Sequence, residues 1–135
     1  MVYACRPAET KVHRAFYYWK SQFRLDSTEL QTIDQLKVEK LYVKFFDVVW
    51  NADTYKPQPV AKVNFQDSWP NQLALIPVIF ITNETLQKCQ VSDINTLAQN
   101  LVKLLTSQYE INHLRRPAEI QLDCDWSAGT RHKYF

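Results

Sequence analysis

The chain has 135 residues, of which 46% are hydrophobic, 13% aromatic and 22% charged, and its formal net charge is +2. These values fit one globular domain with its own core and exclude a disordered chain. The chain has a single glycine, Gly129, so it contains no glycine-rich phosphate loop and no glycine-flanked nucleophile elbow, and its dispersed basic residues form no stripe suited to nucleic acid.

The first predicted elements are a strand and a helix. Residues 15–20 are rich in aromatic side chains, which favour strands. Apolar residues at helical spacing then predict a helix over residues 27–38. Two pairs offer a capping box at its start, Asp26 with Glu29 and Thr28 with Gln31.

Two apolar runs predict buried strands in the middle of the chain. Residues 41–50 are apolar on both faces, which is typical of a strand covered on both sides. Residues 51–59 carry two prolines and are predicted to form a loop, followed by a short extended piece over residues 60–65. The next buried strand is predicted at residues 73–81, with Pro77 at a strand start or bulge because proline has no ladder donor.

The last third of the chain repeats the alternation of helix and strand. Apolar residues follow the amphipathic template without error from a cap at Ser92 to near Tyr109, which predicts a long helix. Residues 118–125 form a further predicted strand, and residues 127–135 a loop and the start of a helix. Strands that alternate with helices indicate parallel strands joined by crossovers.

This order predicts an α/β fold in which residues 15–135 form a partial (half) TIM (β/α)8 barrel. Four βα units are about half of such a barrel, for which roughly 250 residues are typical, so we expect the chain to be truncated at its C-terminus. The alternative is a small open doubly wound sheet. Because either fold leaves strand edges uncovered, a dimer through an exposed sheet edge is a further expectation.

Polar and aromatic side chains mark the carboxyl ends of the predicted strands, where sites form in parallel α/β folds. Asp123 and Asp125 share one face of the last strand. The other residues at strand ends are Trp19, Asp47, Trp50, Asn83 and Trp126. Aromatic rings stack on sugar faces, carboxylates bind hydroxyls, and paired carboxylates are what glycosidic cleavage requires. We therefore predict a carbohydrate site with Asp123 and Asp125 as catalytic candidates and the other five as substrate-binding candidates.

Simpler structural roles remain open for several of these residues. Asp47 fits a helix cap or a loop anchor, and Asp125 fits the cap of a helix that begins near Ala128. Trp19 and Trp50 fit core or rim packing.

The histidines and cysteines point to no metal site and no cofactor. The three histidines are scattered, and Cys5, Cys89 and Cys124 fit no ligand spacing. Cys89 and Cys124 are typical of small buried apolar residues.

The run Ile120-Gln-Leu-Asp-Cys-Asp-Trp126 resembles the fourth-strand motif of chitinase-type (β/α)8 glycoside hydrolases, D-x-x-D-x-D-x-E. Asp123 and Asp125 match its second and third aspartates, and Trp126 the tryptophan often found before the glutamate. The resemblance implies that Asp125 orients the catalytic acid and the substrate amide. Ile120 stands where the first aspartate belongs, and Ser127 where the catalytic glutamate belongs, so we expect the chain to be inactive alone.

More broadly, residues 15–135 resemble the N-terminal half of bacterial lipoproteins with a glycosidase-like barrel. Val2-Tyr-Ala-Cys5 is similar to the lipobox of such proteins, in which the cysteine is lipidated. The resemblance implies that residues 1–14 are a tether with Cys5 as its lipid anchor, and that the protein is exported and bound to the membrane only through that anchor. The alternative is a non-catalytic carbohydrate-binding or interaction protein.

Overall fold

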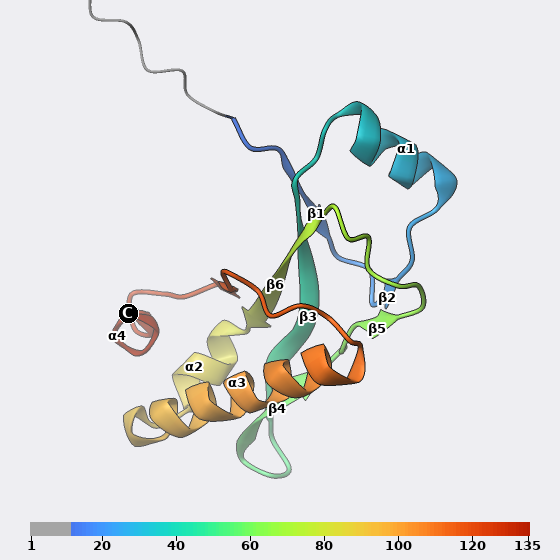
Figure 1. The fold of residues 1–135 in the computed structure, drawn as a ribbon. Helices are drawn as coiled ribbons and strands as arrows, with labels where there is room; N and C mark the ends of the chain where they lie inside the picture. Colours follow the sequence, from blue (N-terminus) through green and yellow to red (C-terminus); the bar gives the residue numbers. More distant parts are fainter. Residues whose placement is uncertain (1–11) are drawn as a thin grey trace, which may run out of the picture.

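The computed structural model describes residues 12–135 (Figure 1). Cys5 and most of the predicted tether over residues 1–14 lie outside the described residues. From residue 15 onward the chain forms a mixed α/β structure whose parallel strands build a curled half-barrel sheet.

Four parallel strands form the wall of this half barrel. They are β1 (Ala15–Tyr18), β3 (Lys40–Asn51), β6 (Ala74–Ile81) and β7 (Gln121–Cys124). Each of them pairs with the next along the chain. A doubly wound sheet would reverse its strand order at a switch point. The prediction of a partial barrel is therefore confirmed, and the doubly wound alternative is not observed.

The two faces of the sheet differ in their covering. On β3, Val43 and Val48 point to the outer face and belong to the main core with Leu105 of the helical layer. Tyr42 and Asp47 point to the opposite, concave face and are half-buried. A bulge between Lys44 and Phe46 interrupts the alternation.

Helices alternate with the strands of the wall, as predicted, and one further short helix over residues 83–88 was not among the predicted elements. They are α1 (Ser27–Gln35), α2 (Asn83–Lys88), α3 (Ile94–Ile111) and α4 (Arg131–Tyr134), with a 3-10 turn at Val91–Asp93 before α3. In Figure 1, α3 crosses the lower part of β3, whereas α1 stands apart near the start of that strand. The helix predicted from Ser92 begins at Ile94, after the 3-10 turn.

The helix ends explain how the chain manages with one glycine. Asp26 and Glu29 form the predicted capping box of α1, each side chain accepting from the other residue's backbone N–H at 2.8 and 3.0 Å. After α1 and α3, Lys37 and His113 adopt left-handed backbone angles, with φ of 51° and 52°. Glycine usually fills this position after a helix. Here longer side chains make the turn.

The segment after β3 differs from the prediction. Residues 51–59 were predicted to form a loop, but β4 (Lys56–Val60) returns antiparallel along β3 as a hairpin. Its two prolines are tolerated because β4 pairs on one side only. Further along, β5 (Asn64–Phe65) pairs with β2 (Gln22–Phe23) in a separate small ladder.

Pro77 also lies elsewhere than predicted. It is inside β6, paired with Val43 one residue before the bulge of β3. On the other side of β6, pairing with β7 begins only at Val78. Pro77 therefore lies where one side of the strand has no ladder to interrupt.

The curl of the sheet is visible in one long-range hydrogen bond. The Tyr17 hydroxyl on β1 donates to the side-chain oxygen of Gln121 on β7 at 3.0 Å. These residues are on the first and last strands of the wall. Two side chains can meet across two intervening strands only if the sheet bends around its concave face.

Candidate functional site

The predicted carbohydrate site, called the rim from here on, lies at the carboxyl ends of β3, β6 and β7 on the concave face. Asp47 pairs across β3 and β6 with Phe80, and Phe80 pairs with Asp123 on β7. Paired residues on neighbouring strands point to the same face. Asp47 and Asp123 thus lie on one face, two strand spacings or roughly 10 Å apart.

An aromatic ladder lines the β1 side of the same face. Trp19 stacks on Tyr17 with ring centroids 5.7 Å apart and planes at 14°, and Tyr17 contacts Tyr42 at 5.0 Å. The side chains of Tyr17 and Trp19 are 52% and 48% exposed. Their rings therefore present a broad apolar surface to solvent beside the polar rim.

Asp47 is held by an ion pair and retains one free oxygen. Lys44 donates to its Oδ2 at 3.0 Å, and both side chains are about four-fifths buried, at 19% and 20% exposure. The other oxygen, Oδ1, is buried and has no hydrogen-bond partner among residues 12–135. A buried carboxylate oxygen without a donor is energetically costly.

Asp123 and Asp125 differ in their surroundings. Asp123 is half-buried within β7, whereas Asp125 follows the strand and is exposed. In the described part of the chain, neither carboxylate has a hydrogen bond or an ion pair to its side chain. Trp126 is 45% exposed and meets the ring of Phe135 edge-on at 5.5 Å.

The structure separates Trp50 and Asn83 from this group. Trp50 follows Val48 by two residues on β3, so it lies on the outer face, opposite to Asp47. The Asn83 side-chain oxygen accepts a hydrogen bond of 2.8 Å from Thr130, which is 1% exposed. Asn83 thus anchors the turn before α4, and Asp125 does not cap that helix, whose N-cap residue is Thr130.

Several rim residues were not predicted from the sequence. Tyr17, Tyr42, Lys44 and Gln121 all lie on the concave face. For two of them the sequence held a signal, because Tyr17 and Gln121 each lie two residues from a predicted site residue and therefore share its strand face. Tyr42 and Lys44 can be placed on this face only through their partners on the neighbouring strands. That placement requires the register between strands, which the sequence does not state.

A charged cluster of Lys40, Tyr42 and Glu119 lies toward the amino ends of β3 and β7 on the concave face. The Tyr42 hydroxyl and the Lys40 ammonium both donate to Glu119, at 2.7 and 3.1 Å. These two donors lower the pKa of Glu119, and the same carboxylate raises the pKa of Tyr42 and of Lys40. The cluster ties β3 to the segment that enters β7.

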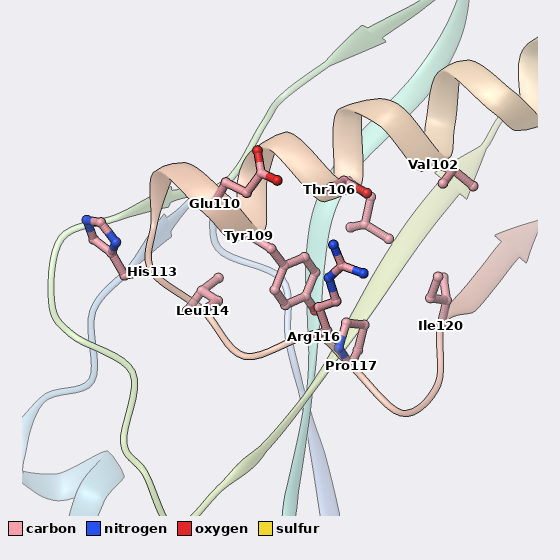
Figure 2. A pocket seen from close by; sticks show the side chains of 10 residues that line it. Val102, Thr106, Tyr109, Glu110, His113, Leu114, Arg116, Pro117 and Ile120 are labelled. Atoms are coloured by element: carbon pink, nitrogen blue, oxygen red, sulfur yellow. The ribbon is translucent and has the colours of Figure 1, made fainter.

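Two hollows flank the loop between α3 and β7, away from the rim. One, of about 540 Å³, lies between the C-terminal half of α3 and that loop (Figure 2). The other, of about 900 Å³, opens at the amino ends of β3 and β6. Neither is lined by the predicted site residues.

Tyr109 lines the hollow in Figure 2 and is 4% exposed. Its hydroxyl has no hydrogen-bond partner among the described residues, and burial raises its pKa. Tyr109→Phe removes this unsatisfied group, so we expect the free energy of unfolding to rise by about 1 kcal/mol, measured by urea denaturation.

The matched control is Tyr18→Phe. The Tyr18 hydroxyl is buried but bonds to Gln22, and it both donates to and accepts from Arg24. We expect this variant to lose about 1–2 kcal/mol. Equal losses in both variants would contradict the view that the Tyr109 hydroxyl is unsatisfied.

No group of three His, Cys, Asp or Glu side chains within residues 12–135 is arranged to hold a metal ion. None of the helices in that range has the length and apolar character of a membrane span.

Comparisons with models of protein families, with curated protein sequences and with solved structures give no match to the chain.

Proposed function

We propose that this chain binds carbohydrate on the concave face of its half barrel, at the carboxyl ends of the strands. The observation that carries the proposal is the stacked pair of Tyr17 and Trp19, whose rings are half exposed next to polar rim groups. Flat aromatic surfaces with convergent polar atoms suit the apolar faces and hydroxyls of a sugar ring.

The carboxylates support a ligand rich in hydrogen-bond donors. Asp47 Oδ1 is buried without a partner, and Asp123 has no hydrogen bond to its side chain within the described residues. A sugar hydroxyl would supply a donor to the partly exposed Asp123. Because such bonds satisfy acceptors that are otherwise unmatched, they favour the bound state.

Binding is favoured over cleavage as the role of this chain. Glycosidic cleavage needs an acid that can protonate the leaving oxygen, in addition to a second carboxylate. Ser127 stands in the place of the acid in the chitinase-type motif, and its hydroxyl lies 3.2 Å from that of Thr130 in the turn before α4. Cleavage by Asp123 and Asp125 is the second candidate, and turnover abolished in both Asp123→Asn and Asp125→Asn would establish it.

Trp19→Ala tests the proposal directly. Loss of an aromatic anchor at the centre of an interface costs about 2 kcal/mol, so we expect roughly 30-fold weaker binding. Binding of soluble malto-, cello- and chito-oligosaccharides would be measured by isothermal titration calorimetry, with saturation-transfer NMR to detect weak contacts.

The control is Trp50→Phe, which changes a tryptophan on the opposite face and is expected to leave the affinity unchanged. The proposal fails if the wild-type chain contacts none of these sugars by saturation-transfer NMR. It also fails if Trp19→Ala binds them as tightly as the wild type does.

A further inference from the structure

The half-barrel sheet ends in two open edges, β1 on one side and β7 on the other. Among the described residues each of these strands has a single strand neighbour. The free side of such a strand presents N–H and C=O groups that favour pairing with another strand, although the Leu122 carbonyl of β7 already accepts a hydrogen bond of 2.9 Å from the Tyr134 hydroxyl of α4. Each edge also exposes an apolar side chain on its outer face, Phe16 at 41% and Leu122 at 46%.

The observed register shows how a second half barrel would meet β7. Gln121 pairs with Val78, and Val78 pairs with Lys44. Tyr18 pairs with Val43, so Lys44 is level with Trp19. Gln121 on β7 is therefore level with Trp19 at the β1 side of the sheet. Trp19 lies four residues after Ala15, where β1 starts.

Half of a TIM barrel accounts for a register shift of four residues between its two edges. The complete barrel has eight strands and a shear of eight, so two identical halves each account for four. Closure with this shear sets Gln121 opposite Ala15 of the second copy. The four residues of β7 then match the four residues of β1 one for one.

In this register the exposed apolar residues of the two edges meet. Leu122 lies beside Phe16 of the second copy, and both point to the outer face, since Leu122 pairs with Ile79 and Phe16 with Leu41 in their own sheets. Cross-strand pairs of an aromatic and an aliphatic side chain stabilise sheets. The pairing would also cover two residues that one chain alone leaves exposed.

The charges at the two edges are complementary. Acidic residues flank or occupy β7, namely Glu119, Asp123 and Asp125, whereas basic residues flank β1, namely His13, Arg14 and Lys20. In the closed register Glu119 is level with His13 of the second copy, and Asp125 lies next to its Lys20. Asp125 is opposite in charge to this Lys20, which in its own chain also pairs with Glu29, and the attraction favours this alignment over one shifted by a few residues.

We propose that two copies of this chain join edge to edge into a closed eight-stranded barrel, with β7 of each copy beside β1 of the other. The two-fold axis runs along the barrel, so both joints are identical. Closure also encloses two ion pairs that the single chain already makes, Lys40 with Glu119 and Lys44 with Asp47. Neither pair loses its partner when the barrel closes.

Sedimentation equilibrium of the 135-residue chain tests the assembly, independently of any sugar. We expect the wild type to sediment at twice the chain mass of 16.0 kDa. Leu122→Lys and Phe16→Asp each place a charge against an apolar partner, so each is expected to sediment as a monomer. The double variant sets lysine opposite aspartate at both joints and is expected to restore the dimer.

The control is Val102→Lys, which adds the same charge at a position of α3 that is 59% exposed and lies on neither edge. It is expected to remain dimeric, and circular dichroism checks that every variant is folded. A monomeric wild type would overturn the proposal, as would a dimer that persists in both single variants. A dimer that the single variants abolish and the double variant fails to restore would overturn the register.

Discussion

Replacing Phe45 with alanine is expected to lower the free energy of unfolding by about 3–5 kcal/mol, because the cavity would open at the junction of three elements. Phe45 is 0% exposed in the bulge of β3. Its ring stacks on Tyr109 of α3 at 5.5 Å and meets Phe65 of β5 edge-on at 5.7 Å. One side chain thus joins the sheet to its main helix and to the small ladder.

Urea denaturation followed by circular dichroism would measure this loss. A change of this size is a large part of the stability of a small domain, so Phe45→Leu provides a milder variant that is expected to lose less than about 1.5 kcal/mol. The control is Tyr55→Ala, since Tyr55 is 77% exposed in the β3–β4 turn. A loss of under 1 kcal/mol in Phe45→Ala would mean that α3 is not anchored through this ring.

Replacing Lys133 with methionine is expected to release the C-terminal turn at a cost of about 1.5–3 kcal/mol, the range for hydrogen bonds to charged groups. The Lys133 ammonium donates to three backbone carbonyls at the end of α2. They belong to Leu86, Gln87 and Cys89, at 2.7, 3.1 and 2.7 Å. These carbonyls end a helix, where a cation also interacts favourably with the helix dipole.

Hydrogen exchange at the amides of residues 130–135 would measure the release, with faster exchange expected in Lys133→Met. The control is Lys88→Met, which breaks only the exposed ion pair of Lys88 with Glu84 and is expected to change stability by less than about 0.5 kcal/mol. If Lys133→Met leaves exchange in this segment unchanged, the rings of Tyr134 and Phe135 hold α4 without the lysine.

The C-terminal turn bears on the proposed sugar site because it adjoins the end of β7. The Tyr134 hydroxyl donates to the Leu122 carbonyl at 2.9 Å, and Thr130 holds Asn83 at the end of β6. Trp126 in turn packs on Phe135. Release of this turn is therefore expected to loosen the β7 side of the rim more than the Trp19 side.

The sequence by itself determined the four strands of the wall, the two longer helices and the parallel direction of the strands. Residues 41–50 and 73–81 are apolar over most of their length, and such runs form the central strands of a sheet. Asp26 and Glu29 set the start of α1 by local hydrogen bonds that need no tertiary partner. The alternation of strands and helices then required parallel strands with crossovers, and the curled sheet has them.

Tertiary structure alone decided which side chains meet on the concave face. Alternation along a strand separates Asp47 from Val48 but does not say which strand lies beside it or at what height. The row from Asp47 through Phe80 to Asp123, and the bond from Tyr17 to Gln121, depend on the register and curl of strands that are far apart in the sequence. The outer-face position of Trp50 and the edge position of β4 likewise emerge only in the assembled sheet, because a strand acquires its faces and its edge from its neighbours.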